Sequence, residues 1–182
     1  SIQVPLEQHY ASHPQDRTRR PGYCLSRHEE YLQDLVALSP DLVIFSEAWQ
    51  EKTLEYLPQT IQEISTVTGA EILLLGRAPQ FSPHPNIVFR NLESIGDINK
   101  VAWKRRYKKY DGFDEKLERI AIDAGSHFIS KNKLICPNGK CQLLIGRSFG
   151  YSDSQHWSQA GMEFYGTQLI EHRVMRLLLT PR

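Results

Sequence analysis

Two continuous apolar runs set the tightest limits on how this chain can fold: DLVIFS at residues 41–46 and EILLLG at residues 71–76. Each has the length of a strand and lacks the alternation of a half-exposed strand, so each predicts a strand buried on both faces, as in a parallel sheet. Residues 51–69 between them form an amphipathic helical pattern closed by Gly69, with Pro58 expected to kink the helix or mark its start. This strand–helix–strand order predicts a βαβ crossover and an α/β fold.

Other signals predict further elements along the chain. A capping box of Ser26 and Glu29 predicts a helix that ends before Pro40. The same kinds of signal predict a helix over residues 114–125, a short strand at 127–130 and a last helix from Ser158 to about Leu179. No repeat or second composition type divides the chain, so we expect residues 1–182 to form a single domain. No apolar run approaches the ~18–20 residues that a membrane-spanning helix needs.

The stretch KVAWKRRYKKY at residues 100–110 contains six basic residues. A nucleic-acid surface is one interpretation. The favoured one is a helix that turns Trp103, Tyr107 and Tyr110, at i, i+4 and i+7, toward the core while its lysines are solvated. The net charge of +1 gives no support to a polyanionic partner, so no nucleic acid is expected.

The cysteines bear on the compartment. Cys136 and Cys141 flank PNGK, and Asn-Gly is typical of a two-residue hairpin turn that would make the two cysteines a facing pair. A disulfide is the favoured interpretation and points to an oxidising compartment; free thiols and a zinc site are the alternatives. Zinc would need about four ligands, for which only Cys24 and scattered histidines remain, so no metal is expected. Cys24 is then left without an assigned partner.

GRSFG at residues 146–150 fits the G-x-S-x-G pattern of a nucleophile elbow. That elbow needs a helix beginning at the serine, whereas no helix is predicted here before Ser158. The sequence therefore disfavours Ser148 as a nucleophile.

Asp153 and His156 are a stronger pair of candidates. A histidine that acts as a general base needs a carboxylate on its other ring nitrogen, to fix the tautomer and to stabilise the imidazolium. A spacing of three residues in a turn ahead of a helix can bring both side chains to one side. The alternative is that Asp153 caps a turn beside an incidental histidine, and spacing alone favours that alternative.

The wider context changes this weighting. The segments ICPNGKC and GYSDSQHWSQAG place, in one register, Cys136, Pro137, Cys141, Tyr151, Asp153, His156 and Ser158. This register resembles the C-terminal end of SGNH-type (GDSL-like) esterase domains, in particular those fused to the membrane acyltransferase-3 family, with Trp157 in place of the usual leucine. PDLVIFSEAW at residues 40–49 and LLLGRAPQF at 73–81 resemble earlier segments of that family, as does the helical segment from Tyr23. The resemblance runs from about Tyr23 to Gly161.

One part of the family pattern is missing. The family's nucleophile lies in a Gly-Asp-Ser-His segment after its first strand, whereas the Gly96-Asp97 of this chain is followed by Ile98. A chain truncated at its N-terminus and a relative that has lost its nucleophile are the two explanations. We expect truncation, because the missing first strand would be central in a doubly wound sheet and Cys24 would gain a possible partner. Ser1 is disfavoured as the nucleophile because no Gly-Asp precedes it.

The resemblance implies a three-layer α/β/α, flavodoxin-like parallel sheet that lacks its first strand. It implies an O-acyltransferase that hands acetyl groups to hydroxyls of a cell-surface polysaccharide through a Ser-His-Asp mechanism, with His156 as base and acid and Asp153 orienting it. Trp49 and Glu47, at the carboxyl end of a parallel strand, are candidates for substrate binding, although Trp49 is equally well explained as a core residue.

The same resemblance implies the setting of the protein. A glycan acceptor, a fused or associated membrane acyltransferase domain and no cofactor are expected, on the periplasmic or extracellular face of a membrane. Two alternatives remain. One is a carbohydrate acetyl esterase, in which water is the acceptor, and the other is a non-catalytic carbohydrate-binding module on a decayed scaffold.

Overall fold

The computed structural model describes residues 21–82 and 95–180, with the side chains of 21–29, 95–97 and 100 left aside. The chain divides into two compact units: Ser1–Leu75 with Glu115–Phe128, and Gly76–Asp114 with Ile129–Arg182. The side chain of Cys24 is among those left aside, so its partner stays a prediction.

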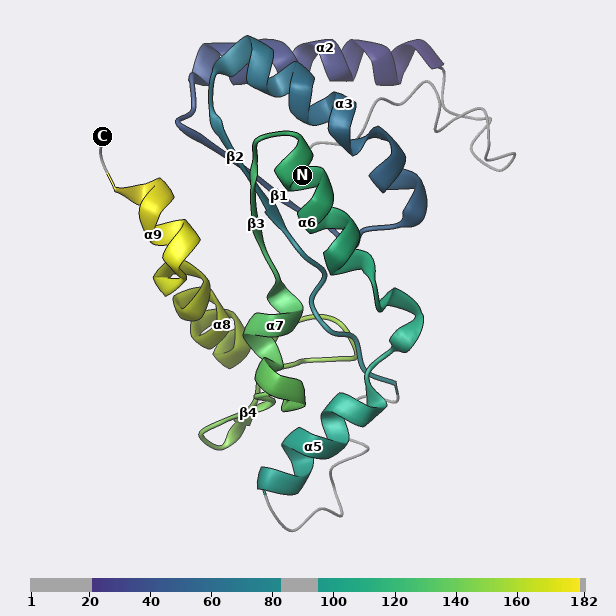
Figure 1. The fold of residues 1–182 in the computed structure, drawn as a ribbon, viewed down its shortest axis with the longest axis vertical. Helices are drawn as coiled ribbons and strands as arrows, with labels where there is room; N and C mark the ends of the chain where they lie inside the picture. Colours follow the sequence, from purple (N-terminus) through teal and green to yellow (C-terminus); the bar gives the residue numbers. More distant parts are fainter. Residues whose placement is uncertain (1–20, 83–94, 181–182) are drawn as a thin grey trace. The chain divides into compact units, whose positions relative to one another are not determined.

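The first unit is built on a parallel βαβ crossover (Figure 1). Strand β1 (Leu42–Ser46) pairs with β2 (Glu71–Leu75) in parallel, with Leu42 opposite Glu71 and Ser46 opposite Leu75. Strand β3 (His127–Ile129) follows β2 in the sheet order β1-β2-β3. The α/β prediction is therefore confirmed, and helices flank the sheet.

The two apolar runs differ in their burial. All of β2 beyond Glu71 is buried, as predicted for a strand covered on both faces. Strand β1 alternates instead: Val43 and Phe45 are buried, while Ile44 is 43% exposed. The prediction of burial on both faces was wrong for β1, because within the described residues β1 lies at one edge of the sheet and the face that carries Ile44 is left exposed.

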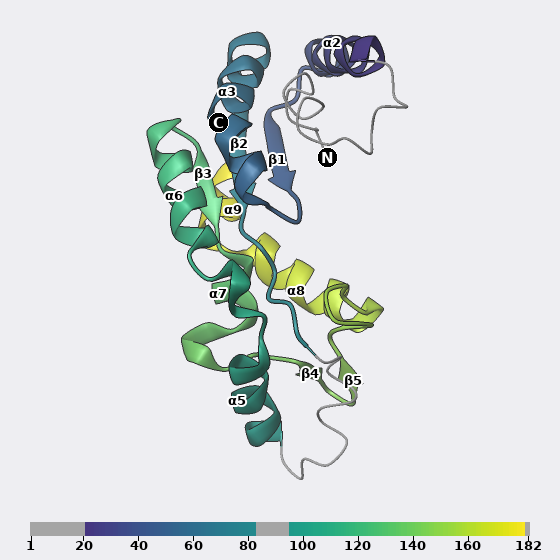
Figure 2. The ribbon, with the colours of Figure 1, turned by 90° about the vertical axis from the view of Figure 1, so that its right-hand side faces the viewer.

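Helix α3 (Glu51–Thr68) makes the crossover and ends where the sequence predicted. Gly69 takes a left-handed conformation, with φ of 66°, and its N–H donates to the carbonyl of Ser65. Pro58 lies inside the helix without ending it. Helix α2 (Pro21–Leu38) begins at Pro21, so Ser26 is inside the helix and is not its N-cap. Helix α2 contacts α3, and Figure 2 shows α3 and α6 (Phe113–Asp123) beside the strands.

The second unit has its own core of buried side chains. Its members come from the segment after β2, from helix α5 (Ile95–Arg105) and from the C-terminal third of the chain: Phe81, Ile98, Ala102, Ile135, Cys136, Cys141, Leu143, Tyr151 and Tyr165. The predicted helix through Tyr110 is wrong, because α5 ends at Arg105 and a separate 3-10 turn, η2, follows at Lys108–Tyr110. Arg106 instead forms an isolated antiparallel β-bridge with Phe81, and the N–H of Tyr107 donates to the carbonyl of Gln80.

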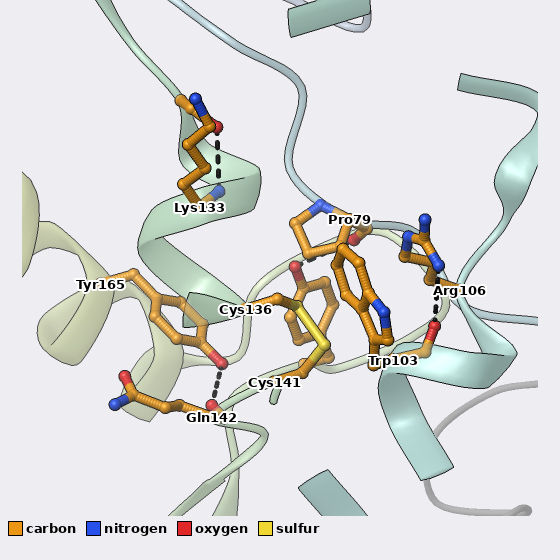
Figure 3. Close-up of a disulfide and its surroundings, with 10 residues drawn as sticks. Pro79, Trp103, Arg106, Lys133, Cys136, Cys141, Gln142 and Tyr165 are labelled. Atoms are coloured by element: carbon orange, nitrogen blue, oxygen red, sulfur yellow. Dashed lines mark hydrogen bonds between the residues drawn. A yellow bond between two sulfur atoms is a disulfide. The ribbon is translucent and has the colours of Figure 1, made fainter. Parts of the chain in front are cut away.

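The predicted disulfide between Cys136 and Cys141 is present and buried in this core (Figure 3). The predicted hairpin around it is not. The segment before Cys136 forms helix α7 (Lys131–Ile135) and no strand, because the Ser130 hydroxyl caps that helix by accepting from the N–H of Lys133. A 3-10 turn, η3 (Pro137–Gly139), follows α7. Gly139, at φ of 72°, lies against the indole of Trp103.

Two strands and two helices complete the unit. Strands β4 (Leu144–Ile145) and β5 (Ser148–Phe149) form an antiparallel hairpin. Helix α8 (Gln159–Glu171) is capped by the Ser158 hydroxyl, which accepts from the N–H of Gly161. The predicted single last helix breaks at His172, and α9 (Arg173–Leu179) follows.

Candidate functional site

Asp153 and His156 lie in a short loop that is closed at its base. Tyr151 and Trp157 form an antiparallel bridge, and inside it the N–H of Ser152 donates to the carbonyl of His156 over 2.9 Å. The Ser158 hydroxyl donates to the carbonyl of Phe149 before α8 begins. These contacts hold the loop at both ends, so the side chains of Asp153 and His156 project from a closed turn.

Asp153 orders this loop through both of its carboxylate oxygens. Oδ1 accepts from the backbone N–H of Gln155 and from that of His156, each over 2.8 Å. Oδ2 is 2.6 Å from Nδ1 of His156, which confirms the contact expected from the sequence. An ionised carboxylate only accepts hydrogen bonds, so Nδ1 carries the proton and the lone pair of Nε2 is left for another partner.

Three hydrogen bonds to its ionised form hold the pKa of Asp153 well below its usual range. The backbone N–H of Gln155 has the largest effect, followed by the side chain and the backbone of His156. The His156 side chain is 68% exposed and that of Asp153 is 47% exposed. The pair is thus accessible to a substrate while its orientation is set by the backbone.

The segment that follows β2 holds the loop from outside. The N–H of Phe81 donates to the carbonyl of Ser154 over 2.9 Å, and the Tyr151 hydroxyl donates to the carbonyl of Pro79 over 3.0 Å. The rings of Phe81 and Tyr151 meet edge to face at 5.1 Å. Backbone bonds and a buried aromatic contact therefore position the Asp153–His156 loop against this segment.

A surface hollow of about 500 Å³ opens beside the pair. It is lined by Gln80, Phe81, Ser82, Tyr107, Tyr110, Asp153 and Ser154. Tyr107 is 48% exposed, contrary to its predicted place in the core. A volume of this size lies within the usual range for small-molecule sites, ~300–1,000 Å³.

Arg77, Asp114 and Lys131 form a group of interacting charged side chains, and Arg77 links this group to the ring of Tyr110. The Arg77 guanidinium, in a side chain that is 7% exposed, lies 3.5 Å from the centre of that ring. Burial lowers the pKa of Lys131 to about 8, while the Asp114 carboxylate opposes that shift and Arg77 adds to it. Asp114 also accepts a hydrogen bond from the Ser130 hydroxyl.

The remaining predicted residues fare differently. Trp49 is 1% exposed and its indole N–H donates to the carbonyl of Leu75 over 2.7 Å, so the structure supports the core interpretation over a ring that contacts sugar. Glu47 is half-buried in the same unit, and its role in binding stays a prediction. Ser148 lies on β5 of a hairpin, and the next helix, α8, begins only at Gln159, which agrees with the sequence argument against an elbow serine.

Of the residues that line the hollow, sequence reasoning predicted only Asp153 as part of a site and missed the other six, among them Tyr107 and Tyr110. The aromatic spacing that suggested a core helix was the available signal for the two tyrosines. It misled because the helix ends before Tyr107.

In the part of the chain that the structure describes, no group of three or more histidine, cysteine or carboxylate side chains is placed to hold a metal ion. Among those same residues, no helix combines the length and apolar character needed to cross a membrane.

The fold and the site together define an α/β protein with an oriented histidine–aspartate pair beside a surface hollow. The family model described as "SGNH domain (fused to AT3 domains)" matches residues 5–171. The chain therefore belongs to this family of SGNH domains fused to AT3 domains.

A comparison with curated proteins finds no match. Among solved structures, the chain is similar to the periplasmic domain of a lipopolysaccharide acetyltransferase from Salmonella ser. Paratyphi A, with a TM-score of 0.69 and 14% identity. The match covers 88% of this chain and 65% of that one. At this identity the likeness shows the fold, and the chain spans only 65% of the length of its relative.

Proposed function

We propose that this chain is the acyl-transfer domain of an O-acyltransferase that places acetyl groups on hydroxyls of a cell-surface polysaccharide. The observation that carries the proposal is the 2.6 Å contact between Asp153 Oδ2 and His156 Nδ1, which leaves Nε2 as an accessible base. Family membership supports the same chemistry, and the lipopolysaccharide acetyltransferase domain of the same fold supports a glycan acceptor.

In the proposed mechanism His156 moves one proton in each half of the reaction. Its Nε2 removes the proton of a serine hydroxyl as that oxygen attacks the acetyl carbonyl of the donor. The tetrahedral intermediate collapses, the bond between carbonyl and leaving group breaks, and Nε2 returns the proton to the leaving group. The acetyl group is then an ester of the serine. Asp153 stabilises the imidazolium that forms on His156.

The second half repeats these steps with the acceptor. His156 Nε2 takes the proton of an acceptor hydroxyl, whose oxygen attacks the acetyl-serine, and the proton then returns to the serine oxygen. Water in place of the sugar hydroxyl gives ester hydrolysis. No Gly-Asp-Ser is found in residues 1–182, so the proposal assigns the serine to a segment outside these residues.

The proposed setting follows from the family. Fusion to AT3 domains supports a membrane acyltransferase domain as the source of acetyl groups, and the fold neighbour supports a periplasmic position. The Cys136–Cys141 disulfide fits that oxidising compartment.

The test uses the full-length protein that contains this chain and a chromogenic acetyl ester. His156→Ala is expected to lower kcat by about a hundredfold or more, because general acid–base catalysis typically contributes 10²–10⁴-fold. His127→Ala is a matched control, since His127 Nε2 also lies 3.2 Å from a carboxylate oxygen, that of Glu71, but belongs to the first unit.

Activity equal to the wild type in His156→Ala would refute the assignment of the base. A wild-type protein that cleaves no acetyl ester and transfers no acetyl group would favour the non-catalytic carbohydrate-binding module. Acetyl release without transfer to any added glycan would favour the esterase.

A further inference from the structure

We infer that the hollow beside Asp153 is a carbohydrate subsite in which a sugar ring stacks on Tyr107. This inference rests on the proposed function, since it places the acceptor or acetylated sugar next to the acid–base pair. Asp153, Ser154, Tyr107 and Tyr110 line the hollow together with Gln80, Phe81 and Ser82.

The chemistry of the lining fits a sugar. A pyranose presents C–H groups on its faces and hydroxyls around its edge, so it needs an apolar ring bordered by hydrogen-bonding groups. Tyr107 supplies a ring that is 48% exposed, and the amide of Gln80 and the hydroxyls of Ser82 and Ser154 supply the polar border. A few polar groups around an apolar surface is the usual composition of a small-molecule site.

The tyrosines are held in place rather than free to move. The ring centres of Tyr107 and Tyr110 are 5.8 Å apart, and Tyr110 meets the ring of Phe113 edge to face at 5.7 Å. On Tyr110 the buried Arg77 guanidinium stacks at 3.5 Å. A fixed aromatic surface loses little conformational entropy when a ligand binds, which favours recognition over a mobile side chain.

The backbone before Tyr107 is braced as well. The Arg106 guanidinium stacks 3.7 Å from the Trp103 ring and donates to the Trp103 carbonyl and to Asp111. Figure 3 shows Trp103 beside the Cys136–Cys141 disulfide, with Arg106 on the other side of the Trp103 ring. The N–H of Tyr107 donates to Gln80, another member of the lining.

Exposure of Tyr107 has no structural explanation in the core. It contributes to no described hydrophobic cluster, whereas Phe81 in the same hollow is 2% exposed and packs in the core. A half-exposed tyrosine in a hollow that reaches Asp153 is therefore available to a ligand of the same reaction.

The experiment compares two kinds of acetyl ester with the full-length protein. One is a panel of fully acetylated monosaccharides (glucose, galactose, mannose and N-acetylglucosamine), and the other is ethyl acetate, which has no ring to stack. The wild type is expected to show a lower KM for at least one sugar acetate than for ethyl acetate. In Tyr107→Ala the preference for that sugar acetate, as a ratio of kcat/KM values, is expected to fall about tenfold, the effect of losing one well-placed binding side chain.

Two further variants separate the ring from other causes. Tyr107→Phe keeps the ring and is expected to retain most of the preference. Tyr31→Ala removes a tyrosine of similar exposure, 41%, that is not part of the hollow, and is expected to retain all of it. An unchanged preference in Tyr107→Ala, or no preference for sugar acetates in the wild type, would overturn the inference while leaving the proposed function in place.

A binding measurement covers the case in which no ester is cleaved. Saturation-transfer NMR uses the four free monosaccharides and a tetrasaccharide built from each of them. We expect magnetisation transfer from the wild-type protein to at least one of these sugars, and loss of that transfer in Tyr107→Ala. That result without ester cleavage would support the subsite and reject the proposed function. Absence of transfer from the wild type would overturn the subsite.

Discussion

The two carboxylate oxygens of Asp153 have different partners. Oδ1 is occupied by two backbone N–H groups of its own loop, and Oδ2 is left for the ring of His156. The capping interpretation and the catalytic interpretation of the sequence are therefore compatible: the cap holds the carboxylate still, and the held carboxylate orients the imidazole.

This division makes Asp153→Asn a sharp test at the scale of one residue. The amide oxygen can keep both backbone hydrogen bonds, but the amide NH₂ group would face His156 Nδ1 and favour the tautomer with its proton on Nε2. We expect the fold of the loop to persist and kcat for an acetyl ester to fall by about a hundredfold or more. Steady-state kinetics and a thermal melt of the variant measure both quantities, with Asp123→Asn, on the exposed end of α6, as control. A variant that keeps full kcat would remove Asp153 from the mechanism.

The side chain of Lys131 is expected to make the stability of the protein depend on pH. Its pKa is about 8 in the folded protein, below its ordinary value of 10.5, mainly because burial penalises the charged form. Below pH 8 both states hold the proton and the cost of burying the charge is fully present. Between pH 8 and 10.5 the unfolded state holds more protons, so this group makes stability rise with pH, by at most about 1.4 kcal/mol per pH unit.

Urea unfolding at pH 7.5 and 9.5 measures that rise as the difference between the wild type and Lys131→Met. The measurements stay below pH 10 because burial raises the pKa of Tyr151 and of Tyr165 in the folded protein. Above that pH the two tyrosines ionise more readily in the unfolded state, which lowers stability and opposes the rise due to Lys131. Parallel pH profiles of the two proteins would contradict the assignment.

At the scale of elements, helix α8 meets the β4–β5 hairpin through two glycines. A Cβ on Gly161 would lie 1.9 Å from the carbonyl oxygen of Gly150, and a Cβ on Gly150 would lie 2.3 Å from the hydroxyl of Tyr165. The N–H of Ser158 donates to that same Gly150 carbonyl over 3.0 Å. This close approach sets where α8 begins, and so it sets the end of the Asp153–His156 loop.

Gly161→Ala is therefore expected to destabilise the protein by about 2–3 kcal/mol, because the added methyl group meets backbone that cannot move freely. Gly166→Ala is the matched control in the same helix, since nothing lies within 4 Å of a Cβ there. It is expected to be neutral or stabilising by up to about 1 kcal/mol. Urea unfolding of both variants decides the matter, and equal effects at the two positions would contradict the close approach.

Elements were predictable where one local signal dominated. The βαβ crossover follows from two apolar runs and Gly69, which the structure uses as predicted. The hairpin around Cys136 was wrong because a cap from Ser130 starts a helix there, although Asn138 still adopts the positive φ, 52°, that suggested a turn. Burial of β1 was wrong because edge position depends on sheet order, which a single run does not reveal.

At the scale of the whole molecule, the candidate site was predictable only in part. The Asp153–His156 contact is local, three residues apart, so sequence spacing could reach it. The hollow joins Gln80, Tyr107 and Asp153, which are far apart in the sequence. They come together through the pairing of Phe81 with Arg106 and through the hydrogen bond from the N–H of Phe81 to the carbonyl of Ser154. Periodicity carries no information about such pairing, and it directed Tyr107 to the core.

The disulfide links molecular stability to the compartment. It closes a short loop, with a sequence separation of 5, and both cysteines are buried. We expect Cys136→Ala/Cys141→Ala to lower the free energy of unfolding by about 2 kcal/mol, the loop-closure contribution for a loop of this size. Urea unfolding with and without dithiothreitol provides the check: reductant is expected to shift the wild type and to leave the double variant unchanged. A wild type that is insensitive to reductant would show that the cross-link adds no stability.

The outer edge of strand β1 affects how the protein behaves in solution. Within the described residues its outer edge pairs with no strand, and Ile44 beside that edge is 43% exposed. Open backbone donors and acceptors next to an apolar side chain form a template on which another extended chain can add. We therefore expect concentrated samples of residues 1–182 to associate through the edge of β1.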